Sequence, residues 1–179
     1  MAQRVAPNLV SGPGVLGYLA AALLVVVCFK AIDGPLGGRA DASVTRSVAM
    51  TATERGFVSA LEQVRAEHDL PAFSGDGQLA AAARAHSREM VATGTFAHGA
   101  FWERIEAHGV TSGQVGETLG WTSVPAGAVA RIVAAWLASP EHRRILLDPV
   151  YRQVGVGVAD GSFKGYPNAV VVTADFHGA

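Results

Sequence analysis

Cysteine is nearly absent from this sequence, and its absence limits the cross-links and sites that the protein can form. The one cysteine, Cys28, lies inside an apolar run close to the N-terminus. The remainder of the chain therefore has no disulfide bond, whichever compartment it occupies, and it has no cysteine-rich metal centre.

Charge is also scarce, which argues against one class of partner. Only 16% of the 179 residues are charged and the formal net charge is -1. From Glu54 onward there are 10 Lys and Arg against 13 Asp and Glu, with no basic stripe. We therefore expect no nucleic-acid partner. Half of the residues are hydrophobic, enough for one domain with a core and a tail.

The N-terminal segment has no charged residue from Val5 to Phe29. Its dense apolar part covers residues 15–29, and a spanning helix needs about 20 residues, so Ala31 and Ile32 would have to join it while Lys30 snorkels. We interpret residues 1–32 as a signal anchor or a cleaved signal peptide, and the sequence leaves both open. A lipoprotein signal ending at Cys28 is disfavoured, because Val27 is bulky.

Residues 33–50 contain mainly Gly, Ala, Ser, Arg and Asp, with little periodicity. This composition predicts a flexible linker. The domain organisation expected from the sequence is therefore 1–32 as the signal segment, 33–50 as the linker and 51–179 as one folded domain. This order predicts an extracytoplasmic protein, membrane-anchored or secreted.

The pattern of the folded domain places helices first and strands last. Thr51 and Glu54 form a capping box before an apolar helical period, and Asp76 is positioned to cap a second helix that Gly94 ends. Further helices are expected over 101–108, from 125 and over 140–147, and strands over 115–122, 153–159 and 169–176, the last two joined by a hairpin loop over 160–168. Such an order indicates the α+β class.

Small residues mark one face of the strand over 153–159. Gly155, Gly157 and Ala159 alternate with valines at 154, 156 and 158. Because side chains alternate across a strand, the small residues share a face that a helix can approach closely. We therefore expect the last two strands to pair antiparallel, with helices on both faces of the sheet.

An ordered set of short motifs carries the remaining information. They are Phe96-Ala-His98, Gly116-Glu117-Thr118, Trp136-Leu-Ala-Ser-Pro-Glu-His142, Gly155-Val-Gly157 and Ala174-Asp-Phe176. In this order they resemble the bacterial branch of the CAP superfamily, the cysteine-rich secretory protein, antigen 5 and pathogenesis-related-1 family with its SCP domain. The resemblance covers about 57–177. It implies a three-layer α-β-α sandwich with a small antiparallel sheet, and a shallow cleft holding two His and two acidic groups.

Two positions depart from the family pattern. Thr118 stands where the family has Asn after the site Glu, and Ser139 stands where the eukaryotic branch has a second Glu. Only three of the four cleft residues are therefore present: His98, Glu117 and His142. Any mechanism that needs the fourth acid is in doubt.

These three residues are the candidate catalytic or binding site. His142 falls in the first turn of a helix, where the positive end of the dipole favours neutral imidazole. Neutral imidazoles at His98 and His142, with the Glu117 carboxylate and water, would suit an open Zn2+ site. The alternative is a buried, hydrogen-bonded His/Glu cluster that only stabilises the fold.

Three functions are consistent with the sequence, which leaves open whether the protein is an enzyme. The first is an extracytoplasmic module that binds a lipid, a cell-wall fragment or a protein partner, and the apolar segment and the incomplete acid set favour it. The second is a metal-assisted hydrolase or peptidase that uses the same cleft. The third is a purely structural domain.

Overall fold

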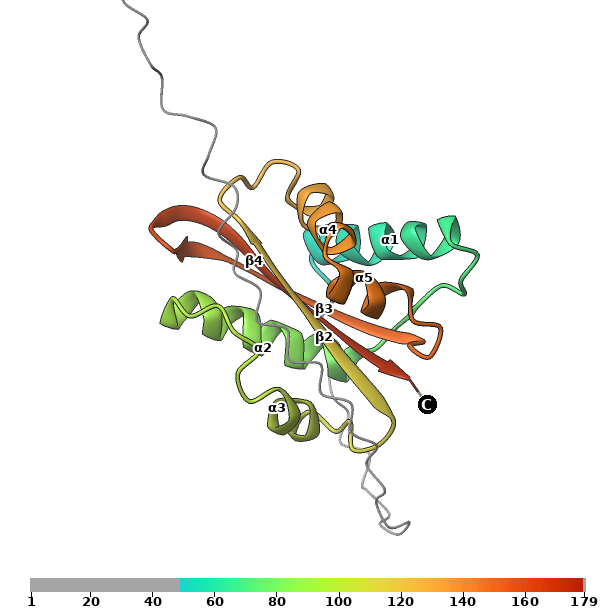
Figure 1. Cartoon of the computed structure of the whole chain (residues 1–179). Coiled ribbons are helices and arrows are strands. Elements are labelled where there is room, and N and C mark those ends of the chain that lie inside the picture. The colour runs from blue at the N-terminus through green and yellow to red at the C-terminus, as the bar shows by residue number, and fades with distance from the viewer. Residues whose placement is uncertain (1–48, 179) are drawn as a thin grey trace, which may run out of the picture.

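The computed structural model describes residues 49–178 and shows an α-β-α sandwich (Figure 1). The signal segment predicted over 1–32 and nearly all of the linker predicted over 33–50 lie outside the described residues. Within 49–178, no helix is long and apolar enough to cross a membrane.

Five helices and four strands follow one another along the described chain. In order they are α1 (Ala52–Glu67), β1 (Ser74–Gly75), α2 (Gly77–Thr93), α3 (Phe101–Ala107), β2 (Gln114–Thr122), α4 (Ala128–Ala138), α5 (Pro140–Leu147), β3 (Gln153–Phe163) and β4 (Tyr166–Gly178). The four strands form one sheet in the order β1-β3-β4-β2.

The sheet is mainly antiparallel, with one exception that the sequence did not indicate. β3 pairs antiparallel with β4, as predicted, and β2 pairs antiparallel with the other side of β4. The two residues of β1 pair parallel with β3, so the predicted small antiparallel sheet also carries one short parallel edge strand. β1 is too short to show an alternating pattern of its own.

The hairpin loop predicted over 160–168 is wrong, because the two strands continue through most of it. The turn is only Lys164 and Gly165, with φ of 50° and 86°. Two successive left-handed residues form the tight type of turn that matches the twist of a hairpin. Phe163 and Tyr166 then pair directly across it.

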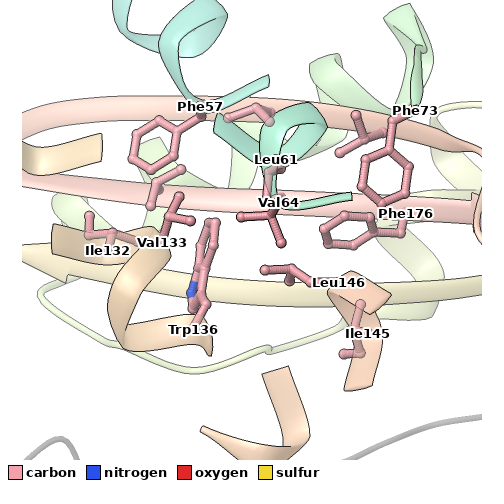
Figure 2. Close-up of a cluster of buried hydrophobic side chains, with 14 of the residues drawn as sticks. Phe57, Leu61, Val64, Phe73, Ile132, Val133, Trp136, Ile145, Leu146 and Phe176 are labelled. Carbon is pink, nitrogen blue, oxygen red and sulfur yellow. The ribbon is translucent and has the colours of Figure 1, made fainter. Parts of the chain in front are cut away.

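Helices cover both faces of the sheet, as the small residues of β3 predicted (Figure 1). α1, α4 and α5 lie on one face over the larger hydrophobic cluster, whose side chains include Phe57, Leu61, Trp136 and Phe176 (Figure 2). α2 and α3 lie on the other face. Trp136, which begins the motif that ends at His142, is thus a core residue and is 2% exposed. Its indole N–H donates to the Leu119 carbonyl at 2.7 Å.

The predicted helix caps are confirmed. The Thr51 hydroxyl accepts from the Glu54 N–H while the Glu54 carboxylate accepts from the Thr51 N–H, which is a complete capping box. Asp76 caps α2 through the Gln78 and Leu79 N–H groups. Gly94 ends α2 in the left-handed conformation, at φ 68°.

Gly155 and Gly157 allow α2 to lie directly against β3. A Cβ at Gly155 would overlap the backbone of Leu79 and Ala80, and a Cβ at Gly157 would overlap the backbone of Ala83 and Arg84. Neither clash can be relieved by a side-chain rotation, because backbone atoms are involved. The two glycines therefore fix the spacing between the helix and the sheet.

Replacing Gly157 with Ala should destabilise the protein by about 1–3 kcal/mol, the usual cost of overpacking. The matched control is Gly77→Ala in the same helix-sheet layer, where a new Cβ would meet no atom within 4 Å. Urea denaturation followed by circular dichroism measures both variants. Equal stabilities for Gly157→Ala and Gly77→Ala would contradict the packing argument.

Candidate functional site

The structure brings His98 and Glu117 into direct contact. His98 lies in the loop between α2 and α3, and Glu117 lies in the middle of β2, on the same face as Val115 and Leu119, which pack against residues of α2 and α3. The His98 Nδ1 and the Glu117 Oε1 are 2.6 Å apart. Arg104, on α3, donates to the other carboxylate oxygen of Glu117, so both oxygens of this buried side chain are engaged.

A second carboxyl group, that of Asp175 on the neighbouring strand β4, lies next to Glu117. The two residues are partners in the register of β2 and β4, so their side chains emerge side by side on the same face. Asp175 is 0% exposed, and no described N–H or O–H donor satisfies either of its carboxyl oxygens. The only group left to share a hydrogen bond with Asp175 is the Glu117 carboxyl itself.

The surroundings decide which acid carries the proton. Burial raises the pKa of Glu117 to about 7, although Arg104 opposes the shift. Burial and the Glu117 charge raise the pKa of Asp175 well above its usual range. Two adjacent carboxylates cannot both ionise in a buried site. Because Arg104 and His98 both contact Glu117, Glu117 is the acid that ionises first, and Asp175 keeps its proton to a higher pH.

His98 is neutral in this arrangement. Burial and the nearby Arg104 charge lower its pKa. A neutral imidazole that faces a carboxylate through Nδ1 donates its N–H there, which leaves Nε2 as a hydrogen-bond acceptor. The His98 side chain is 22% exposed, so ligands in solvent can approach the ring.

His142 lies near His98 but is not bonded to it. It occupies the first turn of α5, in the opposite helical layer, and is partly buried. Burial lowers its pKa first, and a charge on His98 would lower it further. The predicted neutral form is confirmed in direction, with burial as the main cause rather than the helix dipole. No hydrogen bond joins His142 to another residue within 49–178.

Ser139, at the position of the family's second Glu, contacts the Glu141 carboxylate at the start of α5. Ser139 is the N-cap of α5 and Pro140 follows it, as predicted, but its hydroxyl makes no cap hydrogen bond and contacts the Glu141 carboxylate at 3.0 Å instead. Thr118, at the family Asn position, is fully buried and its hydroxyl has no described partner.

The ligand set predicted for Zn2+ does not fit the described residues. No three His, Cys, Asp or Glu side chains within 49–178 are grouped so that they could hold a metal ion. The Glu117 carboxylate is already bound to the Arg104 guanidinium, and a second cation beside that positive charge would be repelled. His98 also uses one of its two nitrogens on Glu117.

The chain can be compared with known proteins on this basis. The family model described as CAP, the cysteine-rich secretory protein family, matches residues 58–176. The chain belongs to this family. The match spans every motif that carried the resemblance, so the CAP domain is the folded unit that presents His98, Glu117 and His142.

Sequence and structure relatives of this CAP domain include bacterial proteins. It is 31% identical over 113 residues to the uncharacterized membrane protein YlbC of Bacillus subtilis, which covers 60% of this chain but only 32% of that protein. An extracellular SCP-domain protein of Bacillus anthracis has a TM-score of 0.59 at 24% identity, covering 74% of this chain and 45% of its own. An outer surface protein of Borrelia burgdorferi has a TM-score of 0.58 at 19% identity, covering 71% and 96%. These structures establish the shared fold.

Two residues of the CAP domain site were missed by the sequence reasoning. Arg104 lies on a helix whose pattern predicted no functional face. Asp175 carried a signal, because it is the one charged residue in the apolar stretch Val170-Val-Val-Thr-Ala-Asp-Phe176, and charged residues are rarely fully buried without a specific partner. That signal identifies a buried acid but does not say which residue it meets.

Proposed function

We propose that the protein is an extracytoplasmic CAP domain that binds a ligand through His98 and His142, attached to the membrane by its N-terminal segment. The supporting observation is that both oxygens of Glu117 are engaged, by His98 and by Arg104. A carboxylate held in this way orients His98. It is poorly placed to act as a base on water or as a metal ligand.

The location is supported by the relatives and by the sequence. The relatives carry the names extracellular, outer surface and membrane protein. The uncharged run from Val5 to Phe29 suits export or anchoring. Among the described residues the domain has no cysteine, so its stability does not depend on an oxidising compartment.

The chemistry of the two imidazoles indicates the class of ligand. Both have lowered pKa values and are neutral at pH 7, so they attract no anion by charge. The free Nε2 of His98 accepts a hydrogen bond from a hydroxyl or an amide. A cell-wall fragment, rich in both groups, fits these acceptors better than a phosphate or a fatty acid does.

Binding can be tested with the full-length protein in detergent micelles. Adding a purified muropeptide should shift the NMR resonances of the His98 and His142 rings. His98→Ala and His142→Ala should each weaken binding by roughly 10-fold, as expected when one buried hydrogen bond is lost. His68→Ala, at an exposed histidine that follows α1, is the control and should bind normally.

The same samples distinguish the alternatives. Chromatography of the muropeptide after incubation would reveal cleavage, and cleavage that disappears in His98→Ala would replace binding with hydrolysis. Phospholipid or a protein partner that shifts the two rings, when muropeptide does not, would redirect the ligand class. Unchanged ring resonances with all of these probes would reject the proposal and favour a structural cluster.

A further inference from the structure

The large hydrophobic side chains that stay exposed in the described part of the chain gather at one end of the domain. They are Met50, Val124 and Tyr166, which are 36%, 38% and 48% exposed. Each is close in sequence to a residue that lines one shared cavity: Thr53, Pro125 and Pro167 respectively. Three distant parts of the chain therefore meet at a single open hollow of about 500 Å3, which is lined by sequence neighbours of the three exposed side chains.

This end, which we call the hairpin end, is far from the His98 site along β4. It comprises the start of α1, the residues between β2 and α4, and the turn between β3 and β4. β4 starts at Tyr166 and passes Asp175 near its other end. At about 3.3 Å per residue, roughly 30 Å separates them.

The hairpin end also carries aromatic and basic side chains that combine an apolar body with a polar tip. The rings of Trp121 and Tyr166 are 5.9 Å apart, and the Lys164 ammonium lies 5.6 Å from the Phe163 ring. Trp, Tyr and Lys are the residues that favour the boundary between water and lipid, because each combines an apolar body with a polar tip.

The polypeptide enters the domain at this same end. Met50 directly precedes the capping box of α1, and the Arg55 guanidinium donates to the Met50 carbonyl at 2.5 Å, which fixes the entry point. The apolar run that we propose as the membrane attachment ends at about Ile32. The flexible linker that the composition of residues 33–50 predicts would have a root-mean-square span of about 20–25 Å, less than the roughly 30 Å along β4, so the hairpin end would be nearest the bilayer.

We infer that the hairpin end, with Met50, Val124 and Tyr166 at its surface, rests on the lipid–water interface. This orientation rests on the proposed membrane attachment of the chain. It directs the His98 site away from the bilayer, toward the medium from which a cell-wall ligand would come. The hairpin end carries an acid, Asp160, which lines the hollow, and a base, Lys164, in the turn, so the contact does not require anionic lipid.

The full-length protein tests this orientation in phosphatidylcholine vesicles. In a Cys28→Ala background, a bimane label is placed at Tyr166→Cys, at Val124→Cys or, as the control, at Thr111→Cys. Thr111 is exposed and precedes Gln114, which pairs with Gly178 at the opposite end of the sheet. Phosphatidylcholine that carries a nitroxide on its headgroup should quench the labels at 166 and 124 at least threefold more than the label at 111.

The outcomes separate this inference from the proposal on which it rests. A full-length protein that does not float with the vesicles would refute both the attachment and the orientation. A protein that floats, with the labels at 166 and 111 quenched equally, would refute the orientation alone. Labels at 166 and 124 that are shielded from aqueous iodide but not quenched by the lipid would assign the surface to a second copy of the chain, and would also overturn the inference.

Discussion

Replacing Arg65 with Met should lower the free energy of unfolding by about 2–5 kcal/mol, because buried backbone carbonyls lose their hydrogen-bond donor. Arg65 lies in the last turn of α1 and is 0% exposed. Its guanidinium donates to four backbone carbonyls, those of Pro71, Leu146, Asp148 and Tyr151, at 2.8–3.2 Å. It also lies 4.2 Å from the centre of the Phe73 ring.

The reason for so large a loss is that methionine fills the volume but provides no N–H. The carbonyls of Leu146 and Tyr151 are in buried hydrogen bonds with Arg65 and would be left without a donor. Each buried acceptor that loses its donor costs about 1–3 kcal/mol. These carbonyls belong to α5 and to the segment that leads into β3, so the substitution loosens the contact between α1 and both elements.

Thermal and urea denaturation measure this effect. Arg65→Lys should recover only a small part of the loss, because one ammonium cannot reach all four carbonyls. Arg88→Met, at an exposed position of α2, serves as the control and should change stability by less than about 0.5 kcal/mol. A loss below 1 kcal/mol for Arg65→Met would show that water replaces the guanidinium at these carbonyls.

The sequence predicted those features that depend on neighbouring residues. The capping box at Thr51, the Asp76 cap and the left-handed Gly94 each need only a few adjacent residues, and all three are confirmed. The alternation of valine and glycine in β3 predicted a closely packed helix, because a strand side chain has only two faces to choose from.

The turn between β3 and β4 shows where local reasoning is insufficient. The stretch Gly161-Ser-Phe-Lys-Gly-Tyr-Pro167 is rich in turn-forming residues, and it predicts a loop. Pairing of the long strands overrides this preference and confines the turn to Lys164 and Gly165. Lysine rarely adopts a positive φ, so the sequence did not identify this turn.

The residues of the candidate site likewise fall into those that the sequence identified and those that only the fold brings together. The family motifs identified His98 and Glu117, and the structure places them in contact. Asp175 was predictable as a residue but not as a partner, because its pairing with Glu117 depends on the register between strands more than 50 residues apart in sequence. Arg104 donates to Glu117 only because α3 packs against the face of the sheet that carries Glu117, where Ile105 of α3 and Val115 of β2 share one hydrophobic cluster.

Replacing Asp175 with Asn should make stability less sensitive to pH. In the native protein burial raises the pKa of Glu117 to about 7 and the pKa of Asp175 well above its usual range, whereas the ordinary values that apply in the unfolded chain are 4.5 and 3.8. The native state therefore holds more protons than the unfolded state in this window. The free energy of unfolding of the wild type then falls as pH rises, by about 1.4 kcal/mol per pH unit for each extra proton.

Asparagine removes this dependence while preserving the geometry. Its amide N–H can donate to Glu117 as the protonated Asp175 does, but it cannot ionise, so no second negative charge develops as pH rises. The lowered pKa values of His86, His98 and His142 make stability rise with pH in an overlapping window. This contribution of the histidines is nearly the same in the wild type and in Asp175→Asn, so it cancels in the difference between their free energies of unfolding.

Urea denaturation at a series of pH values from 4 to 8 measures that difference. Asp175→Asn should match the wild type near pH 4 and exceed it by about 2 kcal/mol or more at pH 8. Asp160→Asn, at an exposed position of β3, is the control and should follow the wild type throughout. If Asp175→Asn instead loses stability most at high pH, then Asp175 is ionised in the native state. The negative charge beside His98 and Arg104 would then lie on both acids rather than on Glu117 alone.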